Sequence, residues 1–238
     1  MGLGLLAQMT GAAEVAPVTL FNAGFSGRNS AQAVARLQQD VLVHAPQHVV
    51  LYFGMNDAMN SQNLCPLETY ARNMETLIQR LQTNRVRTVV LVTCNPIIEA
   101  YVAARHPRHP QRQALQAHLE RYNARIRQLA QQYQLPCVDL HARVAALGGA
   151  TIASNALLRC EANCGAKDGV HLTREGYVVL GAAVAEALRP HVRAGDRIVC
   201  YGDSLTFGVH VKGAGSTEGE TYPAVVKQRL LQPRNTTP

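Results

Sequence analysis

The sequence has no tryptophan, and aromatic residues make up only 5% of its 238 positions. It also lacks an apolar run of about 20 residues, so we expect no helix that spans a membrane. The apolar start, residues 1–9, has no basic segment before it, and Leu6 stands where a myristoylation signal needs Ser or Thr. These absences argue against a secretory signal and a lipid anchor, and they favour a location in the cytoplasm.

A basic, aromatic-interleaved cluster is absent as well, although the formal net charge is +7 at pH 7. The arginines are spread over several helical patterns, so we expect no binding of nucleic acid. There is no Walker-type sequence, and the glycines of 213–219 miss the G-x-G-x-x-G spacing. His106 and His109 lie in a Pro- and Arg-rich loop without a third ligand. We therefore expect no metal site there and place this loop beside the substrate cleft.

The six cysteines do not define a metal site or a required disulfide. Cys160 and Cys164 share a loop, and their spacing allows a disulfide without requiring one. Cys65 is isolated. The remaining three fall in or beside strand-like runs, where we expect free buried thiols: Cys94, Cys137 and Cys200.

Short apolar runs alternate with helical patterns along a chain that is 47% hydrophobic and 16% charged. The expected strands are 18–22, 48–53, 88–93, 136–140 and 197–202. The expected helices are one that carries Val34, Leu37, Val41 and Leu42, followed by 66–81, 111–133, 173–189 and 222–231. Residues 95–110 and 148–170 show no clear element. This alternation predicts a parallel sheet with helices on both faces, in a single domain over 1–238 whose residues 1–16 show no periodicity.

The most informative stretch is 197–206, where an apolar run of strand length ends at Gly202 and Ser204 follows two residues later. Active sites of α/β proteins lie beyond the carboxyl ends of the strands, and glycine permits a tight exit from a strand. We expect Ser204 at this rim, with its backbone N–H pointing outward, as a nucleophile requires. Taken alone, Gly-Asp-Ser is a common turn.

Three other loops contain residues that a serine nucleophile needs. Asp168 and His171 are three residues apart, so the carboxylate can orient the imidazole that accepts a proton from a serine. Asn56 follows the strand 48–53 and can donate an amide N–H to an oxyanion. Gly27 offers an unhindered backbone N–H near a helix start. Each alone is an ordinary turn residue, and only the combination indicates a catalytic site.

Together these blocks resemble the SGNH, or GDSL-type, hydrolases over about 18–231. The matching blocks are Gly202-Asp203-Ser204-Leu205, Asn22-Ala23-Gly24-Phe25-Ser26-Gly27, Gly54-Met55-Asn56-Asp57 and Asp168-Gly169-Val170-His171. The resemblance implies that Ser204 is the nucleophile, His171 the general base and Asp168 its orienting partner. It also implies an oxyanion hole made by the Ser204 and Gly27 amides and the Asn56 side chain.

The order of the blocks differs from the family order, because the serine block comes first in the family and last here. This order is a rotation, as circular permutation predicts, and a triad depends on geometry and not on chain order. Doubly wound sheets of this size often have the strand order 2-1-3-4-5. We therefore predict a flavodoxin-like three-layer α/β/α sandwich with a five-stranded parallel sheet. Its spatial order would be 18–22, 197–202, 48–54, 88–94 and 136–140.

The predicted function is that of a serine ester hydrolase that forms an acyl-serine intermediate and needs no metal or organic cofactor. No large insertion would build a lid or a long acyl tunnel, so we expect short acyl groups, acetyl above all, on carbohydrates or small alcohols. The alternatives are a thioesterase or lysophospholipase of the same fold, or a catalytically silent binding module. No feature of the sequence points to a particular oligomeric state.

Overall fold

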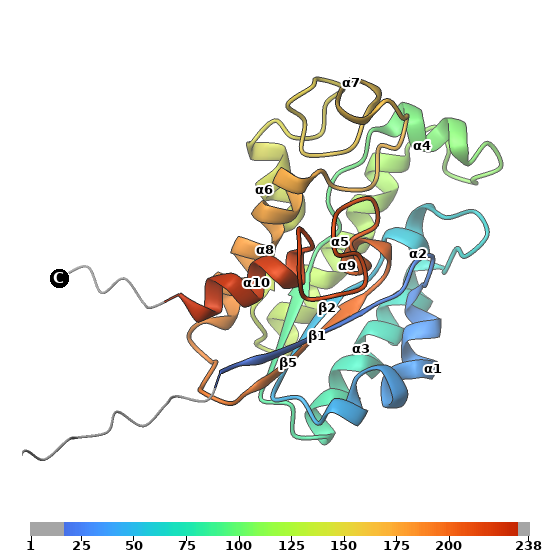
Figure 1. Cartoon of the computed structure of the whole chain (residues 1–238). Helices are drawn as coiled ribbons and strands as arrows, with labels where there is room; N and C mark the ends of the chain where they lie inside the picture. The colour runs from blue at the N-terminus through green and yellow to red at the C-terminus, as the bar shows by residue number, and fades with distance from the viewer. Residues whose placement is uncertain (1–16, 233–238) are drawn as a thin grey trace, which may run out of the picture.

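Five parallel strands form one sheet in the computed structural model, which describes residues 17–232 (Figure 1). The strands are β1 (Thr19–Gly24), β2 (His48–Tyr52), β3 (Thr88–Val92), β4 (Cys137–Val138) and β5 (Arg197–Gly202). All residues of β2 and β3 are buried, as expected of strands that are covered on both faces. Burial on both faces explains why these strands are continuous apolar runs in the sequence.

The order across the sheet is β1-β5-β2-β3-β4. The last strand of the chain therefore lies between the first two, and Val199 of β5 pairs with Phe21 of β1 and Val49 of β2, both in parallel. This confirms the predicted strand order and the flavodoxin-like three-layer α/β/α class.

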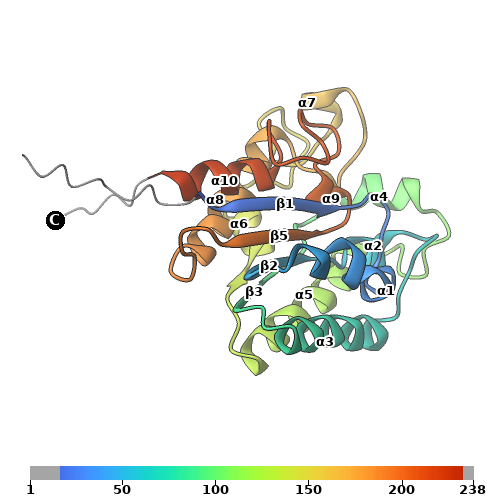
Figure 2. The same ribbon diagram turned by 60° about the horizontal axis from the view of Figure 1, so that its bottom comes forward.

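Helices cover both faces of the sheet (Figure 2). One face carries α1 (Ser30–Asp40), α3 (Leu67–Thr83) and α5 (Leu115–Gln132). The other carries α6 (Leu140–Ala146), α8 (Arg174–Leu188) and α10 (Tyr222–Leu231). Buried Tyr70, Met74, Leu77 and Leu81 recur at helical spacing along α3, so its apolar stripe faces the sheet. No helix within 17–232 is long and apolar enough to cross a membrane.

Short helices at the carboxyl ends of the strands build the rim where the sequence placed the site. They are α2 (Met55–Met59), α4 (Glu99–Arg105), α7 (Glu161–Cys164) and α9 (Ser204–Phe207), and a 3₁₀ turn, η1 (Leu42–His44), lies elsewhere, after α1. The helix α4 was not predicted, because Val102 is its one fully buried residue and gives no periodicity. A tertiary contact supports its start, since the Ile98 N–H donates to the Gly169 carbonyl at 2.9 Å.

The fourth strand is shorter than the sequence indicated. Only Cys137 and Val138 pair with β3, because Asp139 caps the following helix α6 by accepting the N–H of Ala142. The prediction that Cys137 is buried was wrong, since β4 is an edge strand and its thiol is exposed.

The expectation of buried free thiols is confirmed for two other cysteines. Cys94 and Cys200 are buried free thiols, and Cys160 and Cys164 are also free, without the disulfide that their spacing allows. Residues 1–16, where the sequence shows no element and no convincing secretory or lipidation signal, lie outside the described residues. A single domain over 1–238 therefore stays a prediction.

At the amino ends of the strands a polar network centred on buried Asp196 fastens the link between α8 and β5. The Asp196 carboxylate lies 2.9 Å from His48 Nε2, is paired with Arg87, and accepts the Arg193 N–H at 2.8 Å. The Asp196 carbonyl accepts the Thr19 N–H at 2.9 Å. This link, which the permuted order requires, is thereby tied to β1 and β2, and through Arg87 to the start of β3.

Candidate active site

Ser204 is the first residue of α9 and comes two residues after the end of β5. The Asp203 carboxylate caps α9 by accepting the Leu205 N–H at 2.9 Å. Gly202 permits this tight exit, because a Cβ there would lie 2.0 Å from Thr206 Oγ1 and 2.6 Å from the Tyr52 carbonyl oxygen. The absence of a side chain lets α9 turn closely over the sheet and places half-buried Ser204 at the rim.

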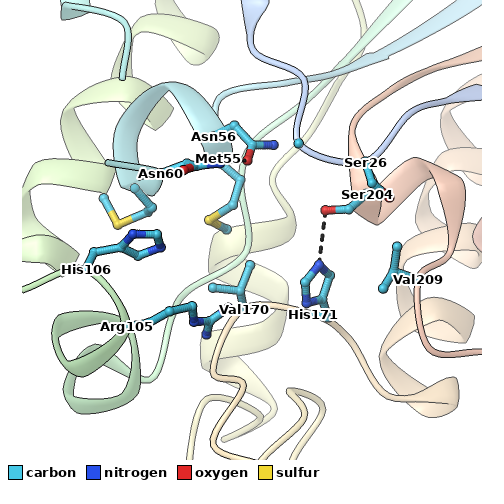
Figure 3. Close-up of a pocket in the computed structure, with 12 residues that line it drawn as sticks. Ser26, Met55, Asn56, Asn60, Arg105, His106, Val170, His171, Ser204 and Val209 are labelled. Carbon is cyan, nitrogen blue, oxygen red and sulfur yellow. Dashed lines mark hydrogen bonds between the residues drawn. The ribbon is translucent and has the colours of Figure 1, made fainter. Parts of the chain in front are cut away.

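A chain of hydrogen bonds joins three of the predicted site residues, and Figure 3 shows the one between His171 and Ser204. His171 Nε2 lies 3.0 Å from Ser204 Oγ, and His171 Nδ1 lies 2.9 Å from Asp168 Oδ2. When Nδ1 donates to the carboxylate, Nε2 is left as the acceptor that faces the hydroxyl. This arrangement can take the proton of Ser204 as its oxygen attacks a carbonyl carbon.

Asp168 is held as an ionised group. Its Oδ1 accepts the N–H groups of Val170 and His171 at 2.9 Å, and Arg105 and Arg159 each lie 3.9 Å from the carboxylate. Burial alone would raise the pKa of Asp168, but the hydrogen bonds and charge of His171 and the backbone N–H groups outweigh it and hold the pKa well below its usual range. The carboxylate can therefore stabilise an imidazolium at His171.

Two backbone N–H groups beside the serine are free to bind an oxyanion. Gly27 and Ser204 line the same pocket, and neither N–H donates to an acceptor within residues 17–232. Gly27 has φ of 79°, a left-handed conformation that favours glycine, and its carbonyl is fixed by the Asn63 amide at 2.8 Å. The two donors can thus be preorganised before substrate arrives.

Asn56 has a different arrangement from the one the sequence predicts. Its Nδ2 already donates to the Arg28 carbonyl at 3.0 Å and to Asp203 Oδ2 at 3.1 Å, and its Oδ1 accepts from Asn60 at 3.0 Å. Figure 3 shows its amide nitrogen turned toward the side of the pocket where Ser204 lies. To serve as a third oxyanion donor, Asn56 would have to share or exchange one of these partners.

Two buried aspartates of the motif blocks were missed as site residues. Burial raises the pKa of Asp203 to about 7, although the Leu205 N–H, the charge of His171 and Asn56 oppose the shift. Burial also raises the pKa of Asp57 to about 6, opposed by the hydroxyl and N–H of Ser30. Asp203 orients Asn56, and Asp57 ties α2 to the start of α1. Their positions inside the Gly-Asp-Ser and Asn-Asp strings were a signal for these roles.

A pocket of about 290 Å³, which we call the serine pocket, opens beside Ser204 and His171. The apolar part of its lining includes Met55, Met59 and Val170. Arg105 and His106 also line it, so the structure supports the expectation that the Pro- and Arg-rich loop borders the cleft (Figure 3). His109 of that loop is instead buried, and its Nε2 is hydrogen-bonded to the Ala58 carbonyl oxygen at 2.8 Å.

His210 is a further residue at the site that the sequence analysis missed. Within residues 17–232, the one cluster that could hold a metal ion is Asp168, His171 and His210, whose ligand atoms lie within 4.8 Å of one another. Both ring nitrogens of His171 already face Asp168 and Ser204, and two guanidinium groups at 3.9 Å from Asp168 repel a cation. The geometry suits acyl transfer better than metal binding.

Comparison with known proteins identifies the family. A sequence model of the GDSL-like lipase/acylhydrolase family matches residues 2–179, which contain the glycine, asparagine and histidine blocks. The match ends before Ser204, as expected when the serine block has moved to the other end of the chain. The lipoprotein YqeF of Bacillus subtilis, described as uncharacterized, is 34% identical over 89 residues, and the match covers only 37% of each chain.

Solved structures share the fold at low sequence identity. A GDSL-like lipase from Bacteroides thetaiotaomicron is 24% identical, with a TM-score of 0.55 over 70% of this chain and 74% of its own. A lipase/acylhydrolase from Enterococcus faecalis is 19% identical, with a TM-score of 0.57 over 76% and 99% of the two chains. An acetylxylan esterase from Geobacillus stearothermophilus is 21% identical, with a TM-score of 0.52 over 68% of each.

The family match covers most of the chain. The serine block of this chain lies outside the match, and the strand order shows that its strand nevertheless lies inside the same sheet. This chain belongs to the GDSL-like lipase/acylhydrolase family of ester hydrolases, with its motif blocks in circularly permuted order.

Proposed function

We propose that this protein is a serine esterase that removes short acyl groups, acetyl above all, from carbohydrates or small alcohols. The observation that carries the proposal is the chain of hydrogen bonds from Asp168 through His171 to Ser204 Oγ. A serine hydroxyl with this partner, beside a pocket and two free backbone N–H groups, has the parts that acyl transfer needs.

The reaction follows from these positions. Ser204 Oγ attacks the acyl carbon while His171 Nε2 takes its proton, and the carbonyl oxygen becomes an oxyanion near the Gly27 and Ser204 N–H groups. The bond to the alcohol oxygen then breaks, and His171 returns the proton to that oxygen. Water, activated by His171 in the same way, releases the acid and restores Ser204.

The size of the serine pocket supports a short acyl group. Its volume of about 290 Å³ lies at the lower end of small-molecule sites, and its lining combines the apolar Met55, Met59, Val170 and Val209 with polar residues. The structural neighbour from Geobacillus stearothermophilus is an acetylxylan esterase, which makes an acetyl group on a carbohydrate a reasonable first choice.

Labelling with a fluorophosphonate probe tests the enzyme against the catalytically silent binding module. We expect one adduct on Ser204, located by peptide mass spectrometry, and no adduct in Ser204→Ala. Folded protein that stays unlabelled at Ser204 would favour the binding module.

A series of p-nitrophenyl esters tests the acyl length. We expect kcat/KM to fall steeply from acetyl and butyryl esters to octanoyl and longer ones, because the pocket is small and polar residues interrupt its apolar lining. A preference for long chains would favour a lysophospholipase, and faster cleavage of acyl thioesters than of matched oxygen esters would favour a thioesterase.

The location in the cytoplasm stays a prediction, and the partial relative from Bacillus subtilis is described as a lipoprotein. The absence of nucleic-acid binding stays a prediction as well, and an electrophoretic mobility-shift assay would test it.

A further inference from the structure

A second cavity lies behind the segment that follows the nucleophile helix. Its volume is about 530 Å³, and we call it the polar cavity. The segment Gly208–Val211 separates it from the serine pocket, because Val209 lines the serine pocket while His210 and Val211 line the polar cavity. The attack on the acyl carbon takes place at the serine pocket and gives the polar cavity no role.

His210 connects the polar cavity to the catalytic groups. Its ring packs edge-to-face against His171, with centroids 5.2 Å apart, and its Nε2 lies 3.7 Å from Asp168 Oδ2. The backbone of His210 is left-handed, with φ of 72°, a conformation that costs free energy for a residue with a side chain. The side chain remains 46% exposed, so burial of this ring does not explain the conformation. Such strain is typical of residues that are positioned for function.

The polar cavity has charges of both signs and many hydrogen-bonding groups. Arg174 pairs with Glu220 at 3.4 Å, and Glu175 also lines the wall. Arg159 lies 3.9 Å from Asp168, but its buried Nε has no hydrogen-bond partner. An anionic ligand would meet the two glutamates, and an apolar chain would strip water from all these groups. A neutral molecule with many hydroxyl groups can both donate to the glutamates and accept from the arginines.

We propose that the polar cavity binds the alcohol part of the ester, that this alcohol is polyhydroxylated, as a sugar is, and that His210 contacts it. The inference rests on the proposed function, because the alcohol oxygen must receive its proton from His171 Nε2 when its bond to the acyl carbon breaks. The alcohol therefore leaves beside the His171 ring, against which His210, a lining residue of the polar cavity, packs. A volume of about 530 Å³ is ample for a sugar ring.

The test compares two acetyl esters that differ only in the alcohol: an O-acetylated methyl pyranoside and p-nitrophenyl acetate. Asn155→Trp fills the polar cavity from its lining, and Thr151→Trp adds the same side chain to the same loop outside that lining. His210→Asn removes the ring but keeps a residue that tolerates the left-handed backbone. Circular dichroism and urea unfolding establish that each variant is folded.

We expect Asn155→Trp and His210→Asn to lower the ratio of kcat/KM for the pyranoside ester to that for p-nitrophenyl acetate by at least about tenfold. Thr151→Trp should leave the ratio unchanged. The inference is wrong if both substrates lose equally, which would make His210 a positioning residue for His171, or if the ratio does not move. It is also wrong if wild-type protein cleaves p-nitrophenyl acetate but not the pyranoside ester. Failure to cleave either ester would instead contradict the proposed function.

Discussion

Two histidine–aspartate pairs lie at opposite ends of the sheet, with the same separation of their side chains. At the carboxyl ends of the strands, His171 Nδ1 is 2.9 Å from Asp168 Oδ2. At the amino ends, His48 Nε2 is 2.9 Å from Asp196 Oδ2. Each aspartate also has a guanidinium group nearby, from Arg105 and Arg159 in the first pair and from Arg87 in the second.

The pairs differ in what the second ring nitrogen of the histidine meets. His171 Nε2 faces Ser204 Oγ at 3.0 Å, beside a pocket. His48 is fully buried, and its Nδ1 has no hydrogen-bond partner. The separation within a histidine–aspartate pair is therefore no evidence of catalysis. A nucleophile and a cavity on the far side of the imidazole distinguish the candidate site from the network that fastens the strand link.

Ser204→Ala should have the largest effect, because it removes the group that makes the two pairs different. We expect the hydrolysis of p-nitrophenyl acetate to fall about 10³-fold or more. The urea midpoint should stay close to that of wild type, since the half-buried side chain is at the rim. Retention of most of the wild-type rate would assign the chemistry to another residue.

Asp168→Asn tests the pair at the carboxyl rim directly. The substitution removes the charge that stabilises an imidazolium and fixes the tautomer of His171, so kcat should fall roughly 10²–10⁴-fold. The matched control is Asp196→Asn, the same chemical change in the other pair, which should leave kcat near the wild-type value at 25 °C. Equal losses of kcat in the two variants would contradict the distinction drawn between the pairs.

Asn56→Ala asks whether the carboxyl rim has a third oxyanion donor. We expect a fall in kcat of roughly 10²–10³-fold with a much smaller change in KM, because the donor acts on charge that develops in the transition state. The Asn56 amide also binds the Arg28 carbonyl and Asp203, so the kinetics are to be measured where urea unfolding shows the variant folded. An effect confined to KM would place Asn56 in ground-state binding.

Asp196→Asn should act on stability. The substitution weakens the interactions of residue 196 with His48 and Arg87 and leaves buried polar groups unsatisfied. The free energy of unfolding should therefore fall by about 2–4 kcal/mol. Urea denaturation measures this loss. A stable variant would show that the network contributes little to fastening the link between α8 and β5.

The pH dependence of stability sharpens the comparison further. Burial lowers the pKa of His48 against the opposing effect of Asp196, so stability should be lost as the pH falls below the unfolded value of about 6.5. Burial opposes ionisation of Asp196, but hydrogen bonds from His48, the Arg193 N–H and Arg87 outweigh it and lower its pKa. The stability that ionised Asp196 contributes is therefore present above about pH 3.9 and is lost as the pH falls below that value.

His48→Gln isolates the first of these two effects. Between pH 7.5 and pH 5.0 the urea midpoint of wild type should fall, and that of His48→Gln should fall less. Identical slopes would assign the acid sensitivity to other groups.

The sequence by itself determined the strand runs, the long helices and the family. Continuous apolar runs identified β2, β3 and β5, because a buried parallel strand is apolar on both faces. The motif blocks marked the rim residues, because a strand exit needs glycine and polar groups at fixed local spacing. The rotated order of these blocks, combined with the common doubly wound order 2-1-3-4-5, then predicted that β5 lies between β1 and β2, with Ser204, Gly27 and Asn56 at three adjacent strand ends.

The tertiary structure alone decided which partners the polar groups have. The Asn56 amide meets Arg28 and Asp203, which are 28 and 147 residues away in the chain. His210 reaches His171 only because the loop after α9 folds back over the triad, and no local pattern encodes that contact. Local sequence determines burial, turns and caps, whereas the partner of a side chain depends on segments that packing brings together from distant parts of the chain.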